Sequence, residues 1–544
     1  MGHSPIDGDT GANASQVPPG QHRLVTALLQ LLRTQHPGEA VRLIETHISF
    51  VLLTQALAYK IKKAVSLGFV DFSSLARRRF YCDEELRLNR RLAPELYLEV
   101  IDITGTVDEP RLGGTGEVIE HALKMRAFPQ HGLWDTLVVQ GGLSAQHLDQ
   151  LAGQLCALHE GAAVSGPQTG FGLPDKVRAP MLDNLDALGT LLPPGAERAD
   201  LDRLRCWEAQ RFAALTPKFE RRQREGRVRE CHGDLHLGNL TMIDGRPVMF
   251  DCLEFNEELR WTDVMSDVAF LAMDLQSHQR ADLAHRFVNA YIECSADHDG
   301  ARVLRYYMVH RALVRAKVAA LRANQARGAE VEASSRMRDR YLASASELAR
   351  APRPTLMLAH GFSGSGKTSF TQSLIEALGA IRVRADVERK RLHGLDATRR
   401  SGSALNAGLY SAQATAATYG RLQQAARAVL DGGFNVILDA TFLQHAQRLQ
   451  ARALAADMGA AFVLLDFRAH VATLRQRVRR REALGLDASE ANLEVLESQI
   501  ARDEPLQPDE SDAVFAFDAE LPLEPSAVAA AWAPLIEQLA APSP

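Results

Sequence analysis

The sequence of 544 residues lacks several features that mark common classes of protein. Its six cysteines lie far apart and form no Cys-x-x-Cys pair, so neither a zinc site nor a disulfide framework is indicated. No apolar run approaches the length of a membrane span, and the polar N-terminus is unlike a signal peptide; we therefore expect a cytoplasmic protein without membrane contact. A formal net charge of -5 argues against a general nucleic-acid binder.

The chain does have an ordinary globular composition, over a length that exceeds one hydrophobic core. Hydrophobic residues make up 46% and charged residues 24%, and the length predicts two or more domains. Residues 1–20 are polar and rich in glycine and proline, and we expect a disordered leader. Two prolines in residues 348–354 predict a linker between a first domain at 21–347 and a second at 355–544. We expect the two to fold independently.

The first domain changes along its length from a strand-rich to a helix-rich pattern. Residues 21–46 have leucines at helical spacing and predict a helix, and residues 47–63 predict two paired strands with a break at Thr54. A charged helix is expected at 74–91, followed by further strands. From residue 144 to about 350 the pattern is mostly helical. We therefore expect a β-rich lobe followed by an α-rich lobe.

The strongest cluster of polar residues in this domain is HGDLHLGN at residues 232–239, followed by Asp251 at the end of an apolar strand. An aspartate beside an acceptor hydroxyl can orient it and take its proton. An asparagine and a second aspartate supply the oxygen ligands that Mg²⁺ prefers. Asp234 is therefore the candidate catalytic residue, and Asn239 and Asp251 are the candidate metal ligands.

Upstream residues supply candidate contacts to the nucleotide. Lys60 lies on a predicted strand, where it could reach the α- and β-phosphates, and Lys62 shares its face because strand side chains alternate. The following helix carries Glu84 and Glu85, one of which could pair with the lysine. We assign Lys60 and Glu84 to the nucleotide site and leave Lys62 and Glu85 open as alternatives.

In this order the residues resemble the aminoglycoside phosphotransferase family of the protein-kinase-like fold, whose members carry an HGDxHxxN catalytic loop. The resemblance covers roughly residues 40–345. It implies a bilobal α+β domain that transfers phosphate from ATP with Mg²⁺. It also implies that Asp234 is the catalytic aspartate, that Asn239 and Asp251 hold the metal, and that Lys60 binds phosphate.

The second domain opens with a phosphate-binding loop. GFSGSGKT at residues 361–368 matches G-x-x-x-x-G-K-[ST] at every fixed position, between an apolar strand and a predicted helix. Its glycines let backbone amides face phosphate oxygens, Lys367 reaches the β- and γ-phosphates, and Thr368 ligates magnesium. The nucleotide site is therefore assigned to Gly361, Ser363, Gly364, Ser365, Gly366, Lys367 and Thr368, with Lys367 also catalytic.

Further residues of this domain follow predicted strands. Asp439 ends the strand FNVILD, a position suited to holding magnesium, and Asp386 follows the strand IRVRAD. Arg477 and Arg481 lie on one face of a helix, where they could cover the transferring phosphate. Strands that alternate with helical stretches predict an α/β domain with a parallel sheet.

This half resembles the P-loop kinases that include gluconate kinases, polynucleotide kinase, zeta toxins and chloramphenicol phosphotransferase, over about residues 354–540. The resemblance implies that an acidic residue after the second strand orients the acceptor hydroxyl. Asp386 matches that residue by position and is assigned as the catalytic base.

The sequence thus predicts a bifunctional ATP-dependent phosphotransferase that acts on hydroxyl groups of small molecules at two Mg-ATP sites. One alternative is that the P-loop half is a regulatory ATPase that controls the first domain. Another is that it phosphorylates RNA ends or a nucleotide-sugar, although the net acidity disfavours long nucleic acid. The acceptors, the coupling of the sites and the oligomeric state are left open.

Overall fold

The computed structural model describes residues 17–67, 70–166, 168–192, 195–350, 353–396, 411–484 and 489–540. Its contacts group into two compact units, Met1–Gln140 with Arg229–Thr262, and Gly141–Val228 with Asp263–Pro544. Most of the expected leader lies outside the described residues, but helix α1 (Pro19–Gln35) begins inside it. Residues 351 and 352 of the expected linker also lie outside them, and α11 (Ala329–Ala349) runs two residues into the linker. The domain limits stay a prediction.

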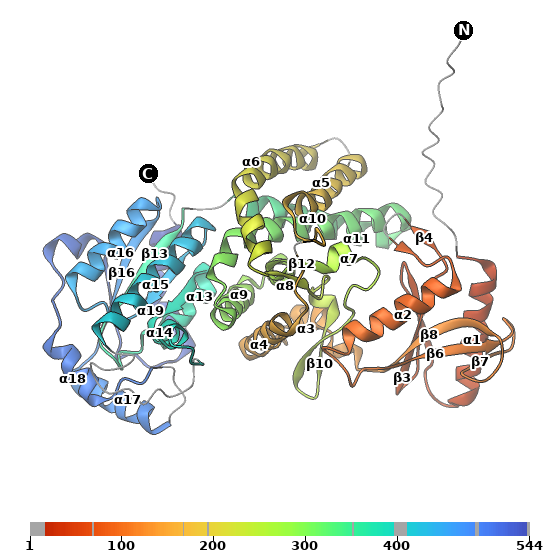
Figure 1. Ribbon diagram of the computed structural model, residues 1–544, viewed down its shortest axis with the longest axis horizontal. Helices are drawn as coiled ribbons and strands as arrows, with labels where there is room; N and C mark the ends of the chain where they lie inside the picture. The colour runs from red at the N-terminus through yellow and green to blue at the C-terminus, as the bar shows by residue number, and fades with distance from the viewer. Residues whose placement is uncertain are drawn as a thin grey trace, which may run out of the picture. The chain divides into compact units, whose positions relative to one another are not determined.

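An antiparallel sheet of six strands, in the order β1-β2-β3-β8-β6-β7, is the centre of the first unit (Figure 1). The strands are β1 (Arg42–Glu45), β2 (Ser49–Leu53), β3 (Leu57–Lys62), β6 (Tyr97–Gly105), β7 (Pro110–Leu112) and β8 (Val118–Arg126). The predicted β2–β3 hairpin is confirmed. The helix expected at 21–46 is too long, because α1 ends before Pro37 and Gly38 and the next regular element is the strand β1.

The two faces of this sheet differ because side chains alternate along β3. Tyr59 and Ile61 join an apolar core with leucines of α1, including Leu28. Lys60 and Lys62 point to the other face and contact helix α2 (Leu75–Asn89). One face of the sheet is therefore a core, and the other carries charged groups.

Residues 229–262 of the same unit carry the predicted catalytic loop. The loop runs into the antiparallel hairpin of β10 (Leu240–Ile243) and β11 (Arg246–Met249). His232 is buried, and its Nε2 lies 2.9 Å from the carbonyl oxygen of Phe250. The N–H of Phe250 in turn donates to the carbonyl of Asn239 at 3.1 Å. These bonds hold the loop beside the chain segment that carries Asp251.

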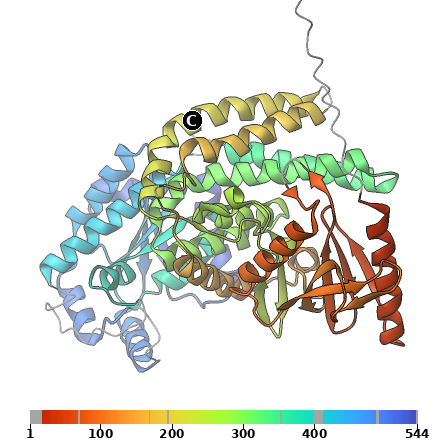
Figure 2. The same cartoon turned by 45° about the vertical axis from the view of Figure 1, so that its right-hand side comes forward.

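The second unit begins with helices, as the sequence predicts. They include α4 (Ala145–Gly161), α5 (Pro174–Leu191), α6 (Ala196–Arg224), α8 (Val264–Ser277), α9 (Ala281–Ser295), α10 (Ala301–Gln325) and α11. Helices α5 and α6, yellow in Figure 2, lie side by side. Helix α8 is buried over nearly its whole surface, which explains its apolar sequence. Among the helices of the described residues, none has the length and apolar character needed to cross a membrane.

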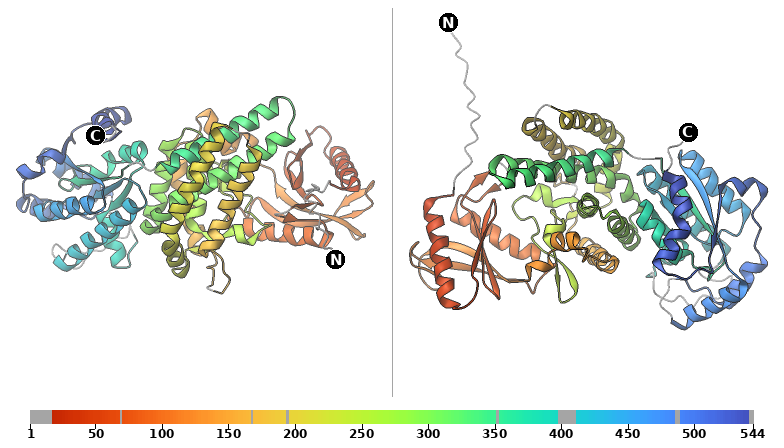
Figure 3. Two further views of the ribbon diagram at one scale, coloured as in Figure 1. Left: turned by 90° about the horizontal axis from the view of Figure 1, so that it is seen from above. Right: turned by 180° about the vertical axis from the view of Figure 1, so that it is seen from behind.

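A parallel sheet of five strands, in the order β14-β15-β13-β16-β17, follows in the same unit (Figure 3). Its strands are β13 (Thr355–His360), β14 (Ile381–Arg384), β15 (Val436–Asp439), β16 (Ala461–Arg468) and β17 (Val514–Asp518). The helices around it include α13 (Gln372–Leu378), α14 (Ala385–Leu392), α15 (Ala412–Asp431), α16 (His445–Asp457), α17 (Val471–Leu484), α18 (Leu493–Ala501) and α19 (Pro525–Ala540). Every residue of β13 is buried, as expected for the central strand of a covered sheet. The predicted α/β domain is confirmed.

Candidate active sites

The first candidate site is built around the ammonium group of Lys60. Its Nζ donates to Oε1 of Glu85 and to Oδ1 of Asp251, each at 2.7 Å. Burial opposes the charged form, but the carboxylates of Asp251 and Glu85 outweigh it and hold the pKa of Lys60 well above its ordinary value. A permanent positive charge therefore lies beside the carboxylate that is the candidate metal ligand.

Glu85 is the partner of the lysines, and the assignment of Glu84 is wrong in this respect. The buried residues of α2 recur at helical spacing and define its inner face: Arg78, Cys82, Glu85, Leu88 and Asn89. Glu84 lies beside this face and pairs with Arg87 at 2.8 Å. The choice between Glu84 and Glu85, which the sequence left open, is therefore decided by the helical period, because it places Glu85 on the buried face of α2, where it meets the lysines of β3.

Lys62 has a different environment from Lys60. Its side chain is buried and donates to Oε2 of Glu85 at 2.8 Å and to Glu254. Burial opposes its charge, but Glu254 and Glu85 outweigh burial and raise the pKa of Lys62. Glu254 was not singled out by the sequence, because no motif marks it. The geometry favours Lys60 for the nucleotide and gives Lys62 the task of positioning Glu85.

The catalytic loop brings Asp234 and Asn239 together. The Nδ2 of Asn239 donates to the backbone carbonyl of Asp234 at 2.9 Å and to its carboxylate Oδ2 at 3.1 Å. His236 Nε2 lies 3.5 Å from the same carboxylate. The side chain of Asp234 is 38% exposed, so its carboxylate is fixed in direction yet open to a substrate hydroxyl.

Asp251 has an unusual backbone conformation for a residue other than glycine. Its φ is 63°, in the left-handed region, and its N–H donates to the hydroxyl of Tyr97 at 3.0 Å. Residues in such strained backbone conformations cluster at functional sites, where the surrounding structure enforces the conformation. The Asp251 carboxylate and the side-chain amide oxygen of Asn239 are hard oxygen donors of the kind that suit Mg²⁺.

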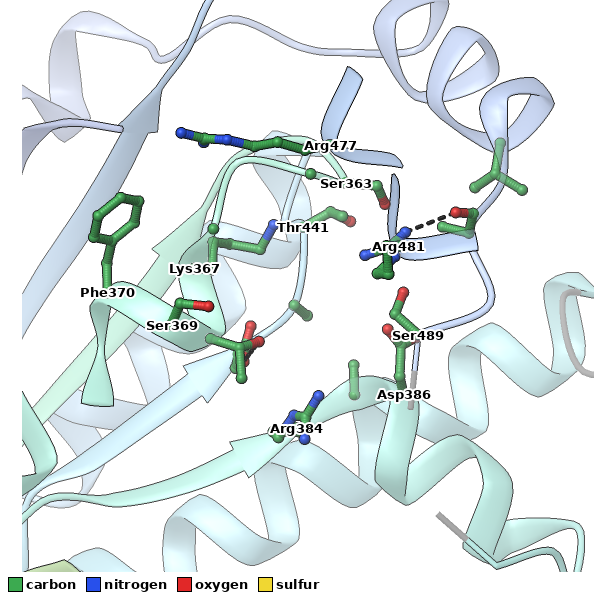
Figure 4. A pocket seen from close by; sticks show the side chains of 18 of the residues that line it. Ser363, Lys367, Ser369, Phe370, Arg384, Asp386, Thr441, Arg477, Arg481 and Ser489 are labelled. Carbon is green, nitrogen blue, oxygen red and sulfur yellow. Dashed lines mark hydrogen bonds between the residues drawn. The ribbon is translucent and has the colours of Figure 1, made fainter. Parts of the chain in front are cut away.

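The second candidate site is a cavity of about 810 Å³ beyond the carboxyl ends of the parallel strands (Figure 4). Nearly all residues predicted for this site line it: Ser363, Gly364, Gly366, Lys367, Thr368, Asp386, Asp439, Arg477 and Arg481. Gly361 and Ser365 belong to the loop but are not among the lining residues. Gly364 has a φ of 87°, and a Cβ there would lie 2.9 Å from the carbonyl oxygen of Leu474. The loop therefore requires glycine at this position.

Thr368 and Asp439 meet inside this cavity. The Oγ1 of Thr368 donates to Oδ2 of Asp439 at 2.6 Å, although 71 residues separate them. Strand β15 ends at Asp439 and pairs in parallel with β13, which leads into the phosphate-binding loop. A hydroxyl and a carboxylate in contact are the oxygen donors expected of a magnesium site, so the residues present fit this ion.

Lys367 donates to neutral oxygens of its own loop. Its Nζ lies 2.8 Å from the carbonyl oxygen of Gly361 and 2.9 Å from that of Phe362. Burial lowers the pKa of Lys367 to about 8, against the raising effect of Asp439 and Asp386. Its charge is therefore only partly compensated by the protein.

The remaining predicted residues surround the other side of the cavity. Asp386 is in the first turn of α14, directly after β14, and its Oδ1 accepts from Arg389 at 2.7 Å. Figure 4 shows Asp386 across the cavity from Lys367. Arg477 donates to the carbonyl of Ala519 at 2.8 Å and Arg481 to that of Ala491 at 2.6 Å, and their side chains point in different directions.

The cavity also has lining residues that the sequence analysis missed, among them Glu293, Arg384, Tyr419 and Ser489. No motif marks any of them. Glu293 lies on α9, far upstream of the phosphate-binding loop, so only the tertiary structure places it here. Arg384 ends β14, two residues before Asp386, and its position could have been inferred from that spacing.

Two family matches agree with these two sites. Residues 72–304 match the phosphotransferase enzyme family, and residues 356–506 match an AAA domain. The first match contains Asp234, Asn239 and Asp251, and the second contains the phosphate-binding loop. The fold and the sites define a two-domain chain of the kinase type, and the chain is a kinase-type phosphotransferase.

Curated relatives extend over most of the chain. Uncharacterized proteins of Mycobacterium tuberculosis and Mycobacterium bovis are each 31% identical over 456 residues, which is 84% of this chain and 89% of theirs. The chain belongs to the family of these proteins.

Solved structures of kinases and phosphotransferases are similar to portions of the chain. A choline/ethanolamine kinase family protein from Mesorhizobium loti covers 60% of this chain and 98% of its own, with 14% identity and a TM-score of 0.36. Aminoglycoside 2'-phosphotransferase-IIIa covers 59% and 99%, with 15% identity and a TM-score of 0.34. A sugar kinase from Janibacter covers 34% and 98%, with 23% identity and a TM-score of 0.26.

Proposed function

We propose that the chain is a bifunctional phosphotransferase that uses ATP and Mg²⁺ at two separate sites and phosphorylates hydroxyl groups of small molecules. The observation that supports the proposal is that each site has its own lysine, its own pair of side-chain oxygens suited to Mg²⁺ and a further aspartate. The two sets share no residue, and they lie in different compact units. We therefore expect each set to bind a nucleotide of its own.

At the first site, Lys60 would bind the nucleotide phosphates while Glu85 fixes its direction. Asn239 and Asp251 would hold magnesium, which neutralises the charge that develops on the phosphates. Asp234 would orient the acceptor hydroxyl and accept its proton as the oxygen attacks the γ-phosphorus. The hydrogen bonds from Asn239 keep the Asp234 carboxylate in place for this step.

At the second site, the loop amides and Lys367 would bind the β- and γ-phosphates, and Thr368 and Asp439 would hold the magnesium ion. Asp386 lies across the cavity, where it would receive the proton of the acceptor hydroxyl. Arg481 would stabilise charge on the transferring group.

We also propose that the enzyme works in the cytoplasm, where ATP is abundant. All six cysteines, each of which lies in the described part of the chain, are free thiols. Unbridged cysteines suit a reducing compartment.

Counting bound nucleotides tests the two-site proposal. With Mg²⁺ and the non-hydrolysable analogue AMP-PNP, we expect two molecules per chain for the wild type, and one each for Lys60→Ala and Lys367→Ala. Isothermal titration calorimetry gives this stoichiometry directly. A stoichiometry of one in the wild type, abolished by either single substitution, would contradict two separate sites.

A regulatory ATPase is the second candidate for the P-loop half. It is favoured by the packing of α9, which lies within the phosphotransferase match, against the edge of the P-loop sheet. In a chain that carries Asp234→Asn, acceptor-independent ATP hydrolysis at a rate unchanged by Asp386→Asn would support this candidate. Hydrolysis or transfer that depends on Asp386 and on an added acceptor supports the second kinase.

A further inference from the structure

Helix α9 joins the phosphotransferase part of the second unit to the P-loop sheet through close polar contacts. Asn289 is buried, and its Oδ1 accepts from the N–H of Arg382 on the edge strand β14 at 2.8 Å. Arg286 pairs with Glu376 of α13 at 2.6 Å. A Cβ built on Gly379 would lie 3.0 Å from the ring of His285, which leaves little room for any larger residue. The helix is therefore packed tightly against the sheet edge.

This packing carries Glu293 into the cavity of the P-loop site. Glu293 lies one helical turn after Asn289 and therefore on the same face of α9. Its Oε1 lies 3.3 Å from Nη1 of Arg384, and both residues line the cavity. The second site thus includes a carboxylate supplied by the part of the chain that matches the phosphotransferase family.

The charges in the cavity are divided between its two sides. On the side of the phosphate-binding loop, Lys367 and Arg481 donate to backbone carbonyls, which carry no net charge. On the side of α14, the two arginines that line the cavity pair with the two carboxylates that line it: Arg384 with Glu293, whose other oxygen lies 3.9 Å from the buried Arg382, and Arg389 with Asp386. Among the described residues that line the cavity, the excess positive charge therefore lies on the side of the phosphate-binding loop, whereas the side of α14 has two arginines and two carboxylates.

We propose that Glu293 binds the acceptor of the P-loop site and that this acceptor is a neutral polyhydroxylated molecule of the sugar or polyol type. A carboxylate accepts hydrogen bonds from hydroxyl protons, and the neighbouring guanidinium donates to hydroxyl oxygens. A charged acceptor would leave one member of a balanced pair uncompensated. The inference rests on the proposed transferase activity of this site.

The reaction follows from the same placement. The acceptor oxygen forms a bond to the γ-phosphorus of ATP, the bond from that phosphorus to the β–γ bridging oxygen breaks, and ADP leaves. The hydroxyl proton passes to the carboxylate of Asp386. Glu293 takes no part in these bond changes and holds a second hydroxyl of the acceptor.

The test uses the full chain with Asp234→Asn as background, so that transfer at the first site is suppressed. Labelled phosphate transfer from ATP is measured to ribose, glucose, myo-inositol and glycerol, and to the anionic gluconate and glucose 6-phosphate. We expect a neutral polyol to be phosphorylated, and Lys367→Ala to abolish that transfer. Glu293→Gln should raise KM for the polyol about tenfold or more while KM for ATP changes less than about twofold.

Asp282→Asn is the matched control, because it removes an exposed carboxylate from the same helix outside the cavity. Its KM values should equal those of the background chain. Binding of labelled polyol in the presence of Mg-AMP-PNP, measured by equilibrium dialysis, should weaken by the same factor as KM in Glu293→Gln. This second measurement separates lost acceptor binding from slower chemistry.

Three outcomes would overturn parts of the inference. Equal acceptor KM in Glu293→Gln and the background would remove Glu293 from acceptor binding and leave the proposed function intact. Transfer only to the anionic compounds, improved by Glu293→Gln, would refute the neutral class. Lack of Lys367-dependent transfer to every compound, together with acceptor-independent hydrolysis, would refute the proposed function of this site and the inference with it.

Discussion

The two lysines that we propose to bind phosphate, Lys60 and Lys367, differ in what surrounds their charge. Lys60 is buried between the carboxylates of Glu85 and Asp251, and its pKa is held well above the ordinary value. Lys367 donates to neutral carbonyls, and burial lowers its pKa to about 8 despite Asp439 and Asp386. At the first site, protein carboxylates balance the charge of the lysine. At the second site, less of the lysine charge is balanced by the protein, so more of it is available to interact with the nucleotide. Two sites of similar chemistry should therefore respond differently to mutation and pH.

The largest expected effects come from the aspartates that we propose to face the acceptors. Asp234→Asn should lower transfer at the first site by about 10²–10⁴-fold, and Asp386→Asn should do the same at the second, because each loses its proton acceptor. Each variant should retain Mg-AMP-PNP binding, and each serves as the control for the other. Labelled transfer to an acceptor of the respective site measures the effect. Loss at both sites in either single variant would show that the sites are not separate.

Removing one carboxylate beside Lys60 should have the next largest effect, and it distinguishes Glu85 from Glu84. Glu85→Gln leaves two buried ammonium groups with one partner fewer and should lower the free energy of unfolding by about 3 kcal/mol. Glu84→Gln breaks a pair on the helix surface and should cost less than about 1 kcal/mol. Urea unfolding followed by circular dichroism gives both values. Similar losses in the two variants would contradict the pairing described here.

The pH dependence of nucleotide binding should show a smaller difference between the lysines. Without nucleotide Lys367 has a pKa of about 8, and bound phosphates raise it, so above pH 8 binding must take up a proton. Affinity at the second site should then fall about tenfold between pH 8.5 and 9.5, while the first site stays nearly constant because Lys60 remains charged. Calorimetry with AMP-PNP on Lys60→Ala reports the second site, and Lys367→Ala reports the first. Parallel profiles would refute the contrast.

Motifs with fixed spacing allowed much of both sites to be predicted. The loop at 361–368 and the HGDLHLGN segment place their residues through local backbone geometry, and Asp439 follows from the strand that it ends. The choice between Glu84 and Glu85 required the orientation of α2, because the hydrophobic pattern of this charged helix is too weak to show its inner face.

Other features depend on contacts that no local pattern encodes. Residues 42–45 form a strand because β2 pairs with them, although their sequence also fits a helix. Glu254 is placed by its pairing with Lys62, nearly two hundred residues upstream. Glu293 enters the second cavity only because α9 packs on β14. Long-range packing decides each of these positions.

The contact between Asn289 and Arg382 also bears on aggregation. Strand β14 is the outermost strand of its sheet, and such strands present backbone groups that can pair with another molecule. The Asn289 side chain accepts a hydrogen bond from one of these backbone groups, the N–H of Arg382, and α9 packs against the strand. A P-loop fragment produced without α9 would expose this margin and should self-associate strand to strand. Helix α9 thus protects the edge of the sheet from pairing with a strand of another molecule.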